Sequence, residues 1–328
     1  MEKIFSKRNK RIMILILLIL SLIIPFFQLS PYYMNILVRI GIYTIMALGL
    51  NILVGYTGIV SLGQAAFVAI GSYGTTILMM KIGMNFFIAM FLSALLAGVI
   101  GLVLGIASLR VNATYLTIVT LGFGEIIRTI IIVWEKVTNG PLGIRNIPSP
   151  TFLGTEFNLT NYGLYYLVLF TLIMVTIFSI LIIRTKLGRA LFAIREDEVA
   201  AIMMGIDSTK YKVIAFVISA ILSSVAGSFL ASQLGYIDQN TFTFEMSTLI
   251  LSIVILGGMG KIRGMYLGAI ILVVFPEVSR YLMEYRYVIY GVILVLMMRF
   301  RPQGLLGWRD TDPYPIPKEY SEKISSGT

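Results

Sequence analysis

Three long stretches without a charged side chain constrain the fold of this chain more than any other feature. They cover residues 40–80, 82–109 and 157–183. A helix needs about 20 apolar residues to cross a bilayer, so the first stretch alone is long enough for two crossings. Only 13% of all residues are charged, whereas about a quarter are charged in soluble domains. The sequence therefore predicts an all-α polytopic membrane protein.

Hydropathy and the positions of charged residues divide the chain into about ten spans. The predicted spans are 12–29, 35–54, 60–80, 84–109, 112–134, 162–183, 212–234, 246–260, 264–279 and 286–300. The eighth and ninth are short, and a re-entrant pair there would change the number of crossings. The transmembrane domain is thus expected to cover 12–307, with a long external loop at 135–161 and a long cytoplasmic loop at 184–211.

Basic residues predict the orientation. We assign nineteen of the 26 lysine and arginine residues to cytoplasmic loops and six to external loops, while Arg128 lies inside a span. This asymmetry places both termini in the cytoplasm. The basic segment 1–11 followed by an apolar run also fits a signal peptide, but "PFFQLSPYY" offers no small-residue cleavage site. We expect an uncleaved first span, and a disordered polar tail at 308–328.

Composition excludes several kinds of chemistry. The chain has no cysteine and no histidine, so it lacks thiolate metal ligands, cysteine nucleophiles and histidine acid–base groups. It also has no G-x-x-x-x-G-K-[ST] motif. We expect no catalytic residue and no metal site, and any ATP and Mg²⁺ to be bound by a partner subunit. The net charge of +10 comes largely from loops beside the spans, so it does not indicate nucleic-acid binding.

The loop from Arg184 to Asp207 carries eight charged residues between two apolar runs. Val199, Ile202, Met203 and Ile206 follow the i, i+3, i+4, i+7 spacing of one helical face. Acidic residues precede this stripe, where they favour a helix N-terminus, and Gly205 can end or kink the helix. A plain solvated connector is the alternative, but a connector needs neither this length nor an apolar stripe. The pattern favours a helix that docks on another protein.

A glycine-rich stretch is the candidate substrate path. Six glycines fall between Gly49 and Gly74, and glycine-interrupted membrane segments can unwind around a polar solute. Close helix packing is an equally good explanation of small residues. The best candidate for an unwound turn is "GYTG" at 55–58. The candidate path residues are Asn51, Gly55, Tyr56, Thr57, Gly58, Ser61 and Gln64.

Glu125 and Arg128 lie inside a predicted span at i, i+3 spacing, so they share a helical face. We favour a structural pair or a contact across a subunit interface over direct contact with substrate. An ion-driven secondary transporter would need titratable carboxylates within the membrane. Glu125 is the only candidate and has Arg128 beside it, so the sequence gives this alternative weak support.

Six motifs in order resemble the branched-chain amino-acid ABC transporter permeases, specifically their LivM-like subunits. One of them, at 188–207, is "GRALFAIREDEVAAIMMGID", in which Ala200, Ala201 and Gly205 match the spacing of the importer coupling loop. The others are "GLNILVGYTGIVSLGQAAFVAIGSY" (49–73), "TYLTIVTLGFGEIIR" (114–128), "NGPLGIRNIP" (139–148), "ILGGMGKIRGMYLGA" (255–269) and "FRPQGLLG" (300–307). The resemblance covers about residues 36–307. Gln64 departs from it, because relatives usually carry histidine there.

This resemblance implies a multi-pass permease subunit in a bacterial cytoplasmic membrane. Its partners would be a second related permease, two ABC ATPases that bind ATP and Mg²⁺, and an extracytoplasmic substrate-binding protein. The substrate would be leucine, isoleucine or valine, with urea, amides or nucleosides as alternatives. The polar loop would be the coupling helix, with its stripe in an ATPase cleft. The implied coupling residues are Gly188, Arg189, Arg195, Glu196, Asp197, Glu198, Ala200, Ala201, Met203 and Gly205.

Overall fold

The computed structural model describes residues 30–108, 113–152, 155–159 and 162–278, and the isolated positions 25, 288, 291, 292, 295, 299, 304 and 305. The predicted spans at 12–29 and 286–300 and the tail at 308–328 therefore lie wholly or largely outside the described residues. Within the described part, six helices are long and apolar enough to cross a membrane. They coincide with six of the predicted spans, because a bilayer forces a continuous apolar run to satisfy its backbone polar groups within a helix.

The long helices follow the predicted order, with bounds shifted by a few residues. They are α2 (Pro31–Leu50), which continues as the π-helix η2 (Asn51–Gly55), α3 (Gln64–Ile82), α4 (Phe86–Ser108), α5 (Ala113–Val133), α7 (Gly163–Arg184) and α10 (Ser208–Leu234). Two shorter apolar helices, α11 (Phe244–Gly257) and α12 (Ile262–Val278), occupy the short predicted spans. A Cβ atom on Gly257 would lie 2.3 Å from the carbonyl oxygen of Gly264, so glycine lets α11 and α12 approach closely.

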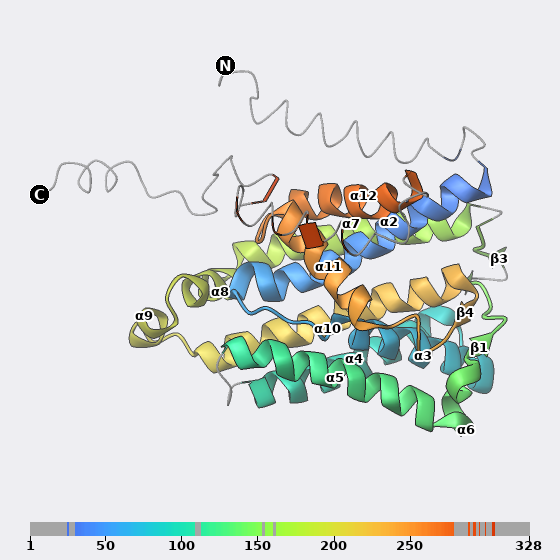
Figure 1. Ribbon diagram of the computed structural model, residues 1–328, viewed down its shortest axis with the longest axis horizontal. Helices are drawn as coiled ribbons and strands as arrows, with labels where there is room; N and C mark the ends of the chain where they lie inside the picture. The colour runs from blue at the N-terminus through green and yellow to red at the C-terminus, as the bar shows by residue number, and fades with distance from the viewer. Residues whose placement is uncertain are drawn as a thin grey trace, which may run out of the picture.

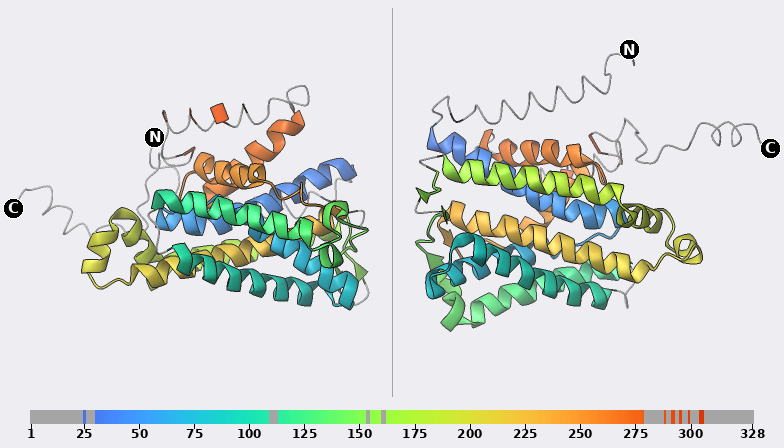
Figure 2. Two further views of the ribbon diagram at one scale, coloured as in Figure 1. Left: turned by 60° about the horizontal axis from the view of Figure 1, so that its bottom comes forward. Right: turned by 180° about the vertical axis from the view of Figure 1, so that it is seen from behind.

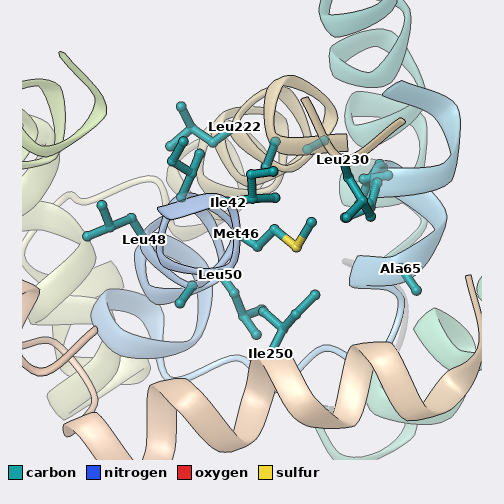
Figure 3. Packing of buried hydrophobic residues seen from close by; sticks show 14 of the residues in the cluster. Ile42, Met46, Leu48, Leu50, Ala65, Leu222, Leu230 and Ile250 are labelled. Carbon is teal, nitrogen blue, oxygen red and sulfur yellow. The ribbon is translucent and has the colours of Figure 1, made fainter. Parts of the chain in front are cut away.

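Helices α2 and α10 form the centre of the bundle. Helix α10 packs against α2, α3 and α4, while α2 also packs against α7, α11 and α12 (Figures 1 and 2). Buried side chains of α2, such as Ile42 and Met46, lie between those of α10 and α11 (Figure 3). The core therefore sits around α2, and α5 lies at the edge of the bundle (Figure 1).

Polar connections gather at the two ends of the bundle. One end carries α8 (Lys186–Glu196) and α9 (Glu198–Met203). The other carries α6 (Glu135–Thr138), the 3₁₀ helix η3 (Gly140–Leu142) and four two-residue strands: β1 (Ile144–Arg145), β2 (Thr151–Phe152), β3 (Thr155–Glu156) and β4 (Tyr236–Ile237) (Figure 1). The antiparallel pairs β1–β4 and β2–β3 are the exceptions to an all-helical structure in the described residues.

A break between α2 and α3 corrects the predicted span at 60–80. Residues 58–63 are not helical, and α3 begins only at Gln64. Distant groups satisfy the backbone there: Thr120 Oγ1 accepts a hydrogen bond from the Leu62 amide at 3.0 Å. Thr117 Oγ1 donates one to the Val60 carbonyl oxygen at 3.1 Å. Because α5 supplies these partners, the segment can remain extended inside the bundle.

The helix break lies deep in the molecule. The side-chain nitrogen Nε2 of Gln64 donates to Ser219 Oγ at 3.1 Å, and Ser219 lies near the middle of α10. With 27 residues, α10 is about 40 Å long. Helix α3 therefore starts roughly halfway along α10. Helix α2 with η2 is long and apolar enough for a full crossing, and the extended segment 58–63 leads from its end to the start of α3.

Candidate functional site

The polar loop folds into two helices separated at Asp197. Its carboxylate caps α9, because Oδ1 accepts hydrogen bonds from the amides of Val199 and Ala200 at 2.9 and 3.0 Å. Gly205 adopts φ +82° just after α9, and the Ile206 amide reaches back to the Ala201 carbonyl oxygen at 3.0 Å. The acidic start and the glycine end therefore define a six-residue helix. Arg195 and Glu196 belong instead to the last turn of α8.

Helix α9 presents an apolar surface to the outside. Val199 is 67% exposed, Ile202 52%, Met203 82% and Met204 83%. Ala201 is buried on the opposite side, and Ile206 is half-buried beyond the end of the helix. We call Val199, Ile202, Met203 and Met204 the α9 patch. The sequence pattern placed three of these residues on one face but did not include Met204. A longer regular helix would have buried Met204, whereas α9 ends at Met203 and leaves it exposed.

Glu198 ties α9 to the start of α10. Its Oε1 accepts hydrogen bonds from Ser208 Oγ at 2.5 Å and from the Lys212 ammonium. Burial of the carboxylate raises its pKa, but the bonds from Lys212 and Ser208 outweigh that effect, so the pKa of Glu198 lies below its ordinary value. Glu198 thus has partners within this chain, although it is displaced by one residue from the alanines of the motif.

The other predicted coupling residues divide by position. Gly188 lies where α7 turns into α8, and a Cβ there would come within 2.4 Å of the Ile183 carbonyl oxygen. Arg189, Glu196 and Ala200 are exposed. Arg195 instead extends towards the bundle, and its Nη1 donates a hydrogen bond to the Gly55 carbonyl oxygen at 2.5 Å. The loop therefore has an outward-facing apolar helix and an inward-facing arginine.

Most predicted path residues are enclosed by protein. Asn51, Tyr56, Thr57, Ser61 and Gln64 are buried, as is Gly55, whereas Gly58 is exposed with φ +76°. A small hollow lies between the extended segment, α5 and the start of α11, and its lining includes Leu62, Ala65, Glu125, Phe244 and Ser247. None of the seven predicted path residues, all of which the structure describes, lines this hollow.

Both explanations of the glycine-rich stretch have a structural counterpart. Gly55 ends the π-helix and Gly58 starts the extended segment, so the backbone does leave the α-helix near "GYTG". In contrast, Gly71 permits close packing, because a Cβ there would lie 2.0 Å from the Ser224 carbonyl oxygen on α10. The stretch combines one break with more than one tight helix contact, because a Cβ on Gly74 would also lie 2.7 Å from Ser93 Oγ on α4.

Glu125 and Arg128 form a pair on the exposed side of α5. Arg128 Nη1 lies 3.4 Å from Glu125 Oε2, and the two side chains are 32% and 48% exposed for Arg128 and Glu125 respectively. Arg128 Nη2 also lies 3.5 Å from Asn240 Oδ1. The pair therefore neutralises its own charge at a surface that also exposes Ile118, Ile126 and Val133.

A family model described as "Branched-chain amino acid transport system / permease component" matches residues 32–298, which run from Tyr32 in α2 through α12 and include the break between α2 and α3. The chain belongs to this family. Permease components are the non-catalytic transmembrane subunits of ABC systems, and this one is a multi-pass membrane protein. The resemblance carried by the six motifs is thereby confirmed.

Individual relatives agree with the family assignment. The chain is 38% identical to the high-affinity branched-chain amino acid transport system permease protein LivM of Escherichia coli K12, covering 92% of this chain and 76% of the relative. It is 24% identical to a probable LivM of Methanocaldococcus jannaschii, covering 88% and 96%. It is also 26% identical to the autoinducer 2 import system permease protein LsrC of Escherichia coli, covering 81% and 78%. No solved structure matches significantly.

In this permease component, sequence reasoning missed the inward direction of Arg195 and the contact between Phe192 and Tyr56. The ring of Phe192 packs at a tilt against that of Tyr56, with centroids 5.1 Å apart, so α8 contacts the end of η2 twice. No local pattern signals such contacts, because the partners are separated by more than a hundred residues. An arginine next to the break of an amphipathic loop is the one feature that could have drawn attention to the position.

Proposed function

We propose that this permease component is one of two permease subunits of an ATP-driven importer for leucine, isoleucine and valine in the bacterial cytoplasmic membrane. Helix α9 would dock in a cleft of an ABC ATPase, and a second ATPase would dock on the other permease. The ATPases would bind ATP and Mg²⁺. An extracytoplasmic binding protein would deliver the substrate to the end that carries β1 and β4.

The observation that carries this proposal is the α9 patch. Four large apolar side chains are more than half exposed on a helix that lies beyond the ends of the membrane-crossing helices (Figure 1). Exposed apolar clusters on short amphipathic helices fit grooves of partner proteins. The patch is also held rigidly, because Asp197 and Gly205 define the helix ends and Glu198 connects it to α10. A rigid element can transmit a push, whereas a flexible loop would absorb it.

Basic residues support a cytoplasmic location for this end. Arg184, Lys186, Arg189, Lys210 and Lys212 all lie in or beside the loop that carries the patch. Loops of this composition stay on the cytoplasmic side of bacterial membranes. ATP is cytoplasmic, so the same orientation is the one that an ATPase partner requires.

The second permease would cover α5. This helix exposes Glu125 and Arg128 together with apolar side chains, and ionisable groups in contact with lipid are costly. A protein neighbour or an aqueous path between two permeases would avoid that cost. The small hollow beside Glu125 would then border the path, and alternating access would open it to each side in turn.

The docking proposal is tested with Met203→Asp, matched by Thr209→Asp, which adds the same charge at an exposed position at the start of α10. A carboxylate in an apolar cleft would lose its hydration without gaining a partner. We expect Met203→Asp to reduce copurified ATPase about tenfold or more, a loss of about 1.4 kcal/mol in binding, while the control has a smaller effect. Unchanged ATPase recovery and unchanged uptake with Met203→Asp would contradict the proposal.

The substrate is tested separately, because the chain also resembles a permease named for autoinducer 2 import. Cells that express the whole system would take up radiolabelled leucine in competition with isoleucine, valine, urea and nucleosides. We expect the branched amino acids alone to compete. If leucine neither enters nor competes, the substrate assignment is wrong, while the importer assignment is judged by the ATPase result.

A further inference from the structure

Arg195 connects the polar loop to η2, to the extended segment 58–63 and to the turn between α11 and α12. Its Nη1 donates to the Gly55 carbonyl oxygen, at the end of η2, across 2.5 Å. A Cβ added to Gly260, in the turn between α11 and α12, would lie 3.2 Å from the same Nη1. One added to Gly58 would lie 3.4 Å from Arg195 Cγ. The arginine side chain therefore lies against the end of η2, the start of the extended segment and the α11–α12 turn together.

These three parts form one tightly packed unit. The Gly260 amide donates to Asn51 Oδ1 at 2.8 Å, which joins the α11–α12 turn to η2. Gly55 has no room for a side chain, because a Cβ would lie 2.1 Å from Asn51 Oδ1 and 2.5 Å from the Gly260 nitrogen. Phe192 on α8 adds a second contact through the ring of Tyr56. A displacement of α8 cannot be absorbed by empty space at this point, so it must move the unit or break the contact.

The chemistry of the contact suits a mechanical link. Carbonyl groups at the end of a helix lack partners within the helix, and a cation there is favoured by both the hydrogen bond and the helix dipole. A charge-assisted bond of this kind is stronger than a neutral one. The π-helix that it caps is a rare form, and such segments are frequent at functional sites. The carbonyl of Gly55 thus connects Arg195 to a point where the helix is interrupted, and not to a regular helix.

We propose that Arg195 is a positioning residue that carries movement of the coupling loop directly to η2, the extended segment 58–63 and the α11–α12 turn. This inference rests on the proposed function, in which ATPases move the loop. Movement of α7 and α10, which flank the loop, is then a second route and not the only one. The extended segment borders the small hollow through Leu62, so its displacement would change the access to the hollow.

The test uses the complete importer with Arg195→Met, Arg195→Lys and, as a matched control, Lys186→Met at the exposed start of α8. Methionine keeps an unbranched apolar stem but has no donor, whereas lysine can still donate to Gly55. We expect Arg195→Met to retain copurified ATPases and ATP hydrolysis, while solute moved per ATP falls about tenfold, within the usual range of coupling between sites. Lysine should restore part of the ratio, and Lys186→Met should leave it within about twofold.

A second readout follows the extended segment without depending on the substrate. The chain has no cysteine, so Val60→Cys gives a single thiol on this half-buried segment. Its reaction with a water-soluble maleimide would be compared in the nucleotide-free and the ATP–vanadate-trapped complex. We expect the rate to change on trapping in the Arg195 parent and in Lys186→Met, but not in Arg195→Met.

The possible outcomes separate the two proposals. If no ATPase copurifies with the unmodified chain, the proposed function fails and this inference with it. If the complex forms but Arg195→Met keeps both the transport ratio and the Val60→Cys response, only the inference is overturned. Loss of the complex in both Arg195 variants would make Arg195 an assembly residue, which also overturns it. An unmodified complex in which Val60→Cys does not respond to trapping would do the same.

Discussion

Substituting Gly71 by alanine should loosen the contact between α3 and α10. The added Cβ would lie 2.0 Å from the Ser224 carbonyl oxygen, whereas ordinary contacts begin at 3.4 Å. The neighbour is backbone, so no side-chain rotation relieves the clash, and the helices must separate locally by about 1.4 Å, the difference between these distances. The hydrogen bond from Ser72 Oγ to the Gly227 carbonyl oxygen, now 2.7 Å, would then exceed hydrogen-bonding distance.

The expected cost follows from these contacts. Overpacking typically costs about 1–3 kcal/mol, and an interhelical hydrogen bond in a membrane protein contributes about 0.6 kcal/mol. The higher helix propensity of alanine returns up to about 1 kcal/mol. The net destabilisation is about 2 kcal/mol, which lowers the Tm by about 4–8 °C on the scale of soluble domains of about 150–250 residues.

Gly122→Ala on α5 is the matched control, because a Cβ there meets nothing within 4 Å. The same propensity gain then stands alone, and we expect an unchanged or slightly higher Tm. A thiol-reactive dye has no target in a chain without cysteine. The assay is therefore the fraction of a fluorescent fusion that remains monodisperse in detergent after heating. A Tm of Gly71→Ala at or above that of the parent, or an equal loss in Gly122→Ala, would refute the reasoning.

Two further predictions concern the polar loop. Gly205→Ala places a side chain at φ +82°, where it meets no steric neighbour. Left-handed strain of about 1–2 kcal/mol should therefore fray α9 and reduce the amount of copurified ATPase. Asparagine tolerates this conformation, so Gly205→Asn should restore much of the ATPase recovery. The pKa of Glu198 is lowered in the folded chain, so its contribution is present above the unfolded pKa and is lost as the pH falls through the folded pKa. Heating experiments should therefore show that Glu198→Gln is less stable than the parent at pH 8, by less than about 1 kcal/mol because the ion pair is partly exposed. At strongly acidic pH the two proteins should be equally stable. A difference in stability that does not change with pH would contradict this prediction.

Local sequence was sufficient where the chain's own neighbours or the bilayer dictate the structure. Charge-free apolar runs predicted the long helices, because an isolated crossing must satisfy its backbone within itself. The i, i+3 spacing of Glu125 and Arg128 predicted their contact, and Gly205 predicted the end of α9. The charged run expected at the start of this helix is divided instead, because Arg195 and Glu196 belong to α8. Each of these rests on groups that lie within a few residues of one another.

The tertiary structure decided where the helices break and what the polar loop touches. The extended segment 58–63 looked like the start of a span because its residues are apolar. It remains extended because Thr117 and Thr120 of α5 supply its hydrogen-bond partners. Likewise, the resemblance placed Arg195 among the residues that contact an ATPase, but its side chain turns inward to the carbonyl of Gly55, 140 positions away in the sequence. Composition and spacing record what a residue needs, whereas only the packed bundle determines which distant group provides it.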